Sequence, residues 1–444
     1  MSLSPTLSSL PLDLQARIIT YLPTLDFITV RHLNTYYNDL TTIHPIFLHT
    51  INLLVVANQH ELQSMQAIQK RKNLFNGFLL VGEQQLIGVR EGSRALHCVH
   101  HLRIDDQCSL HNILQLYTHN LLPYIPIVTS AINADTLPTT ALHFLRLTKQ
   151  RCKQLNVRFM SERQDYDISW LLHMNRCVKE LTSSNDSSNS PPSMQILSCI
   201  GVPIEAAPMV CTMHHLTALQ LYTQTFELDR MLNRQHIDYM TAENHSIDLS
   251  AIQQLVNLRV LSFRVFESKD RQALDVHALM DALASMSLQM LAISVYPCNT
   301  ETLQHDLAPL AQPNCQLYQS CQSLQLNLRP MQGNDAGWDV ADTCDLQPSD
   351  DKLLIEGLKH FRQLQHLAIP FKLLLESQAI IHLQQLQSLT FCQLAHRPAF
   401  EQQCQYINDQ RAVMGLSTIE HFAEGWPEDK WWNRYTAQMV HDQR

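Results

Sequence analysis

The chain has 444 residues, which is more than one ordinary hydrophobic core accommodates, so several domains or one elongated repeat array is expected. It is 45% hydrophobic and only 16% charged, which indicates a folded rather than a disordered protein. The net charge of −9, without a cluster of Lys and Arg, excludes nucleic acid and anionic membrane surfaces as expected partners. No apolar run reaches membrane-spanning length and no secretory signal is visible, so we expect a cytoplasmic or nuclear protein.

The opening residues predict two or three short helices. Apolar residues recur at three- and four-residue spacing on both sides of Pro23, which cannot lie inside a regular helix. The first stripe consists of Leu14, Ile18, Leu22 and Leu25, and the second of Val30, Leu33, Tyr37 and Leu40. A unit of this size buries too little surface by itself, so another surface is expected to cover it.

This segment resembles an F-box. The family pattern begins at "LPLDL" (10–14), continues through Ile18 and Asp26, and ends in register at "LNTYYNDL" (33–40), without a gap. The departures are mild, with Asp13 in place of Glu and Tyr37 in place of Trp. The resemblance covers less than a tenth of the chain.

The resemblance implies a partner for the apolar helices. F-box segments dock on a Skp-type adaptor, which links them to a cullin–RING ubiquitin ligase. The adaptor-binding residues implied here are Leu10, Pro11, Leu14, Ile18, Leu22, Leu33 and Tyr37. The alternative is that these residues pack against the rest of the chain.

A six-residue pattern recurs through the remaining chain: an apolar residue, two others, Leu or Ile, one other, and an apolar residue. The clear copies are "LTALQL" from Leu216, "LRVLSF" from Leu258, "LQMLAI" from Leu288, "LQHLAI" from Leu364 and "LQSLTF" from Leu386. Weaker copies begin at Val99, Leu122, Cys152 and Cys321. The alternation predicts short strands with one buried face, and helical patterns between them, such as "DVHALMDALASM", predict a strand–helix solenoid.

These units resemble the irregular leucine-rich repeats found behind F-boxes. The resemblance implies an α/β fold with a short helical F-box (1–50), a leucine-rich-repeat-like solenoid (51–395) and a C-terminal cap or tail (396–444). Polar insertions are expected at 182–193, 233–250 and 331–350. The asparagine that the family places after the strand is missing, so the turns must be held by other bonds.

Strand-face side chains of the solenoid are the candidate target-binding residues. Gln220 and Ser262, together with Ala292 and Ala368, are expected to line the concave strand surface, although a one-residue shift of register would reverse the faces. Trp338, within an acidic insertion, is a further candidate contact. Trp431 and Trp432 are expected to help cap the last repeat or to anchor a partner.

No signature of catalysis or of a bound cofactor is present. The sequence contains no phosphate-binding glycine loop, no nucleophile motif and no metal-ligand spacing, so we expect neither an enzyme nor a cofactor or metal site. The twelve cysteines form no CxxC pair and are expected to be buried, reduced thiols. The Ser190-Pro191 dipeptide is a possible phosphorylation site.

Together these features predict a substrate receptor of a Skp–cullin–F-box ubiquitin ligase. The opening segment would bind the adaptor, and the repeats would hold an unidentified target protein near the charged conjugating enzyme. The alternative is a repeat-based interaction scaffold with no role in ubiquitination.

Overall fold

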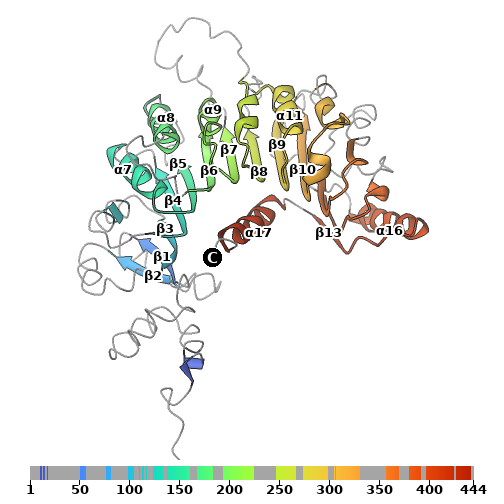
Figure 1. Cartoon of the computed structure of the whole chain (residues 1–444), viewed down its shortest axis with the longest axis horizontal. Coiled ribbons are helices and arrows are strands. Elements are labelled where there is room, and N and C mark those ends of the chain that lie inside the picture. The colour runs from blue at the N-terminus through green and yellow to red at the C-terminus, as the bar shows by residue number, and fades with distance from the viewer. Residues whose placement is uncertain are drawn as a thin grey trace, which may run out of the picture. The chain divides into compact units, whose positions relative to one another are not determined.

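The computed structural model describes residues in 21 separate stretches and single positions of the chain. The described residues are 11–12, 14–15, 18, 51–56, 77–81, 99–104, 110, 113–114, 117, 124–133, 138–160, 168–183, 194–224, 247–266, 274–298, 305, 307–330, 357–369, 380–391, 397–424 and 427–441. They fall into two compact units, the first formed by 1–164 with 183–195 and the second by 165–182 with 196–444. Figure 1 shows the elements of both units.

The first unit contains a parallel sheet with one described helix after its fourth strand. Its elements are β1 (Ile51–Val56), β2 (Gly77–Val81), β3 (Val99–Ile104), β4 (Ile127–Asn133), α7 (Pro138–Lys149) and β5 (Gln154–Met160). The strand order is β2-β1-β3-β4-β5. Residues 138–149 are helical.

The second unit is a parallel sheet whose strands pair in chain order from β6 to β13. Its strands are β6 (Ile196–Pro203), β7 (Ala218–Gln224), β8 (Val260–Phe266), β9 (Met290–Cys298), β10 (Ser323–Pro330), β11 (His366–Ile369), β12 (Ser388–Phe391) and β13 (His421–Glu424). The α-helices of this unit whose bounds are described are α8 (Ile168–Thr182), α9 (Ala207–Val210), α11 (Val276–Ala284), α13 (Leu317–Ser320), α16 (Arg397–Val413) and α17 (Glu428–His441). Short 3₁₀ turns are η4 (Ile204–Ala206), η5 (Ser250–Gln254), η6 (Ala308–Ala311) and η7 (Ile380–His382). The α/β class and the repeating parallel sheet are therefore confirmed.

Each predicted copy in the second unit aligns with a strand that begins two residues after the copy starts. The strand β7 begins at Ala218, two residues after Leu216, and the same offset holds for β8 to β12. Two weak copies in the first unit have another offset, because β3 begins at Val99 itself and the strand near Leu122 begins only at Ile127. Two strands of the second unit, β6 and β13, were not predicted.

Backbone hydrogen bonds align neighbouring units at the first residues of their strands. Two successive amides of one unit donate to a single carbonyl of the preceding unit; Arg259 and Val260, for example, both donate to the Thr217 carbonyl at 2.8 and 3.3 Å. The same forked arrangement recurs on the carbonyls of Arg259, Gln289, Gln322, Gln365 and Gln387. These bonds require no particular side chain, so units without the expected asparagine can still stack in register.

The two faces of the second unit's strands differ in chemistry. Alternate side chains of β7 to β11 point to an apolar face and are at most 2% exposed: Leu219, Leu221, Leu261, Phe263, Leu291, Ile293, Leu324, Leu326 and Leu367. Figure 1 shows α11 and α17 on opposite sides of these strands. Leu279 and Leu283 of α11 are fully buried, and Asp275 caps this helix by accepting a bond from the Ala278 amide at 2.9 Å. The apolar face is thus the core of the repeat array.

The array continues past residue 395, into the segment expected to form a cap. Strand β13 pairs with β12, and the fully buried Arg411 of α16 donates to the Leu383 carbonyl at 2.7 Å and the Ser417 carbonyl at 2.8 Å. Helix α16 ends at Val413, and Gly415 follows in the turn with a φ of 72°, which suits glycine; the Leu416 amide donates to the Arg411 carbonyl at 2.9 Å.

The cysteines whose side chains the structure describes are buried free thiols, as predicted. They are Cys152, Cys177, Cys199, Cys211, Cys315, Cys321 and Cys404. Burial raises the pKa of both Cys199 and Cys211 to about 12, so these thiols are protonated and unreactive at neutral pH. Within the described part of the chain, no helix is long and apolar enough to cross a membrane.

Candidate functional site

The face of β7 to β10 opposite the apolar core carries polar side chains in two adjacent rows. Strand register aligns Gln220, Ser262, Ala292 and Gln325 in one row, and Tyr222, Arg264, Ser294 and Asn327 in the next. We call these eight residues the polar face. Because side chains alternate along a strand, the apolar spacing that builds the core also places these residues together on the other side.

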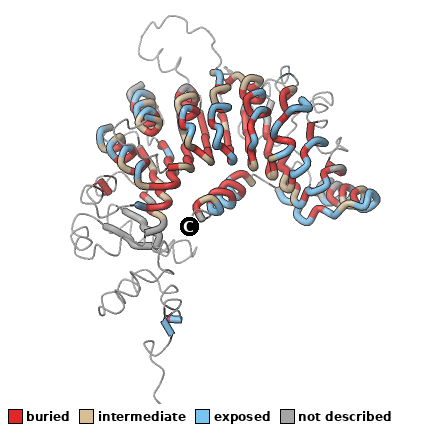
Figure 2. Tube along the Cα trace, in the orientation of Figure 1, coloured by how far each residue is buried: buried red, intermediate tan, exposed pale blue. Residues whose placement is uncertain are grey.

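Helix α17 lies across the polar face. It is amphipathic, and one stripe is buried while the other is exposed, as Figure 2 shows along its length. The buried stripe consists of Glu428, Trp431, Trp432, Tyr435, Thr436 and Val440. This three- and four-residue spacing is that of a helix packed along one side. Helix α17 therefore has a specific docked orientation on the strands.

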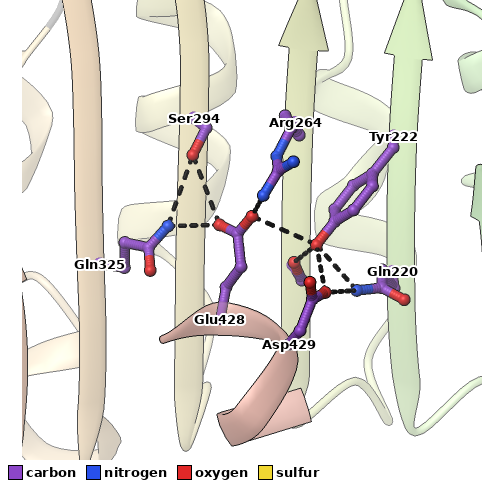
Figure 3. Close-up of polar contacts among 8 residues, drawn as sticks. Gln220, Tyr222, Arg264, Ser294, Gln325, Glu428 and Asp429 are labelled. Carbon is purple, nitrogen blue, oxygen red and sulfur yellow. Dashed lines mark hydrogen bonds and ion pairs between the residues drawn. The ribbon is translucent and has the colours of Figure 1, made fainter. Parts of the chain in front are cut away.

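The first turn of α17 places Glu428 at the centre of the polar face (Figure 3). The Glu428 carboxylate is 1% exposed and forms an ion pair with Arg264 of β8. It also accepts hydrogen bonds from Ser294 Oγ at 3.4 Å, from Tyr222 Oη at 3.3 Å and from Gln325 Nε2. One carboxylate is thus bonded to four consecutive strands, β7 to β10.

Glu428 and Asp429 together form what we call the acidic anchor of α17, in which Asp429 contacts β7 (Figure 3). Its carboxylate accepts hydrogen bonds from Tyr222 Oη at 3.0 Å and from Gln220 Nε2 at 3.2 Å. The Gln220 amide is itself oriented by Ser198 Oγ, which donates to Gln220 Oε1 at 2.6 Å. The two acidic residues also lie at the helix N-terminus, where the helix dipole favours negative charge.

The rest of α17 follows the strands toward β11. Tyr435 Oη lies 2.9 Å from Ser323 Oγ, and Arg434 Nη1 lies 3.2 Å from His366 Nε2. The His366 and Trp431 rings are 6.1 Å apart between centroids. The aromatic residues expected to cap the array are therefore found on α17, beside polar strand residues.

Burial and neighbouring charges alter the acidity of groups at this site. Burial raises the pKa of Tyr222 to about 12, and the nearby Asp429 acts in the same direction. Tyr222 is therefore a protonated donor to both carboxylates at neutral pH. Burial also lowers the pKa of His366, as do the charges of Arg434, His421 and Lys430, so His366 is an uncharged acceptor for Arg434.

The ion pair is reinforced by an aromatic ring. The Arg264 guanidinium lies 4.4 Å from the centroid of the Tyr222 ring, and 23% of the Arg264 side chain remains exposed. The ring and carboxylate hold the guanidinium in one orientation on the polar face. A fixed, partly desolvated guanidinium recognises carboxylates more strongly than a mobile surface cation does.

Two hydrogen-bond acceptors of the polar face are not satisfied by α17. Among the described residues, nothing donates to Gln325 Oε1 or to Asn327 Oδ1, and both side chains are at most 4% exposed. A buried acceptor without a donor costs about 1–3 kcal/mol. Helix α17 therefore supplies no donor to these two acceptors.

The structure brings together two of the candidate target-binding residues. Gln220 and Ser262 are neighbours on the polar face, where they are 4% and 0% exposed, and Ser262 Oγ lies 3.5 Å from Tyr222 Oη. They are covered in this structure, so a target could reach them only after α17 moves. Trp338 lies outside the described residues, as does the whole insertion expected at 331–350. Of the insertions expected at 182–193 and 233–250, residues 184–193 and 233–246 also lie outside them, whereas Thr182 ends α8 and Ser250 begins η5.

Only part of the implied adaptor-binding surface is described. Pro11, Leu14 and Ile18 are exposed, whereas Leu10, Leu22, Leu33 and Tyr37 lie outside the described residues. Leu14 is 47% exposed and Ile18 is 42% exposed, at the four-residue spacing of one helical side. The Gln15 amide donates to the Pro11 carbonyl at 3.0 Å, which is the bond of a helical turn.

Residues that the sequence reasoning missed include Tyr222, Arg264, Glu428 and Asp429. A signal for the first two exists, because polar side chains occupy alternate positions within otherwise apolar strands. For α17, the signal is an acidic pair followed by aromatic residues at helical spacing. In the described residues, no group of three or more His, Cys, Asp or Glu side chains is placed to hold a metal ion.

Comparison with protein families and with curated proteins gives no match. No protein-family model matches the sequence, and no curated protein matches it at a significant level. The functional argument therefore depends on the residues and their geometry.

Proposed function

We propose that this chain is the substrate-recognition subunit of a Skp–cullin–F-box ubiquitin ligase. In this role the opening segment binds a Skp-type adaptor, and the repeat array binds a target protein. The chain supplies proximity to the charged conjugating enzyme and performs no bond-making step itself.

One observation carries the adaptor half of the proposal. Leu14 and Ile18, which lie on one helical side, expose 47% and 42% of their surfaces within the segment whose sequence resembles an F-box. Neighbouring exposed leucine and isoleucine side chains mark interaction surfaces in soluble proteins. An adaptor that packs on these side chains would supply the cover that a short helical unit lacks.

The parallel array supports the receptor half. Repeats that stack only on their neighbours present one side chain per strand at regular intervals, which suits recognition of an extended or helical protein segment. In the second unit the polar face supplies such a row, with a fixed guanidinium among hydrogen-bond donors.

The test is capture of a purified Skp-type adaptor by the full chain. The Leu14→Asp/Ile18→Asp variant should lose binding by at least a hundredfold, because two carboxylates would be placed in an apolar contact. The matched control is Val256→Asp, since Val256 is 81% exposed on another part of the chain. Circular dichroism verifies the folding of each variant.

The outcomes separate the two functions. Adaptor binding that is lost only in the double variant, together with capture of a cullin through the adaptor, supports the ligase subunit. Absence of adaptor binding by the unmodified chain would contradict it and favour an interaction scaffold.

A further inference from the structure

Helix α17 identifies the kind of ligand that the polar face can bind. We propose that this face is a recognition site for an acidic helical segment of the target protein, and that α17 occupies it as an intramolecular ligand. The recognised feature is a pair of adjacent carboxylates followed, one helical turn later, by aromatic side chains. This inference rests on the proposed receptor function and specifies the chemistry of its target.

The contacts at the acidic anchor carry the first step of the argument. Glu428 and Asp429 are bonded to side chains from four strands, including the Arg264 guanidinium, and most of these side chains are donors. Donors from separate strands that converge on one carboxylate pair form a specific anion site. The side chains of α17 that fit it define the chemistry that a competing segment must reproduce.

The chemistry of the two strand faces carries the second step. The core of the array lies on the apolar face, whereas α17 rests on Gln, Ser, Tyr and Arg side chains that water could solvate. Removal of α17 would therefore expose a polar surface and leave the core closed. A helix held in this way can be exchanged without unfolding the repeats.

The unsatisfied acceptors carry the third step. Gln325 Oε1 and Asn327 Oδ1 are buried on the polar face and have no donor among the described residues, so α17 leaves two acceptors of this surface without a hydrogen bond. A target segment that brings a donor, such as an amide or a lysine, to this position would gain bonds that α17 does not make. Such a segment could displace α17 despite the advantage of its covalent attachment, which corresponds to an effective concentration on the order of millimolar.

The test uses the full chain and a fluorescent peptide of residues 427–441 as the probe. In the unmodified chain, α17 competes with the peptide and binding should be weak. In the Glu428→Gln/Asp429→Asn chain, the internal helix loses both carboxylates, and the peptide should bind at least tenfold more tightly. The same peptide carrying Glu428→Gln and Asp429→Asn is the matched control and should show no such gain.

A further variant locates the binding surface. Adding Arg264→Gln to the Glu428→Gln/Asp429→Asn chain should abolish the gain, and hydrogen exchange should show peptide-dependent protection of β7 to β10. If circular dichroism shows that the double variant does not fold, Asp429→Asn alone should give a smaller gain in the same direction. Equal binding of the acidic and neutral peptides, or no gain in a folded variant, would overturn the inference.

These outcomes are independent of the adaptor. The Glu428→Gln/Asp429→Asn chain retains the opening segment and should capture the Skp-type adaptor like the unmodified chain. Failure of the peptide test with intact adaptor binding would remove the acidic-segment site and leave the ligase proposal standing.

Discussion

Replacement of Glu428 by glutamine should release the first turn of α17 from the strands. The substitution preserves the side-chain volume but removes the charge that pairs with Arg264. It also replaces one acceptor oxygen by an NH₂ group, which faces the donors Arg264, Ser294 or Gln325. Removing one partner of a buried ion pair costs about 3–5 kcal/mol. Because Arg264 is partly exposed, we expect the substitution to weaken the docking of α17 by about 2–3 kcal/mol.

The assay is amide hydrogen exchange of α17 in the full chain. A factor of ten in the opening equilibrium corresponds to 1.4 kcal/mol, so exchange within 428–441 should accelerate roughly 30- to 150-fold, while the β8 amides change little. Asp429→Asn is the matched control and should have a smaller effect, since Asp429 is exposed. Unchanged exchange of α17 in the Glu428→Gln chain would refute the assignment of this carboxylate as the anchor.

Three further predictions concern other parts of the second unit. Burial and neighbouring positive charges lower the pKa of His366 below its ordinary 6.5. As the pH falls through 6.5, the unfolded chain therefore binds a proton at this residue before the folded chain does. The contribution of uncharged His366 to the stability of the folded chain is present above pH 6.5 and is lost as the pH falls below it. Exchange of α17, corrected for intrinsic rates, should therefore accelerate below pH 6.5, and less so in His366→Gln. Arg411→Met should lower the free energy of unfolding by about 3 kcal/mol in urea titrations, because buried carbonyls lose their donor, whereas Gly415→Ala should cost only about 1 kcal/mol. Cys199 should resist iodoacetamide in the native chain and react only after unfolding; rapid native alkylation would contradict its burial.

The strands were predictable because their signal is local. Six consecutive residues fix both the alternation and the apolar positions of β7 to β12, whatever the length of the segment between them. Strand β6 was missed although "MQILSC" from Met194 fits the pattern, with Met and Cys in place of the usual leucines. Strand β13 was missed because "IEHFAE" from Ile419 keeps only two of the three apolar positions.

The site was less predictable because its contacts join distant residues. Tyr222 and Glu428 are 206 positions apart, and no local period links them. The alternation predicted that Gln220 and Ser262 share one strand face, but it did not fix whether that face is the concave one. No pattern in the sequence predicted that α17 covers these residues. Trp431 and Trp432 of α17 were predicted to cap the last repeat or to anchor a partner. The first interpretation follows because the exposed apolar edge of a terminal repeat must be covered.

The docking of α17 also changes how the repeats open. An array held by backbone bonds between adjacent units behaves as a one-dimensional chain, in which a terminal unit can fray without affecting units farther along. Glu428 joins β7, β8, β9 and β10 through a single carboxylate, so these strands share an energetic link beyond nearest neighbours. Undocking α17 would therefore lower the cooperativity of the central repeats, and the occupancy of the polar face would set how far a local opening spreads along the array.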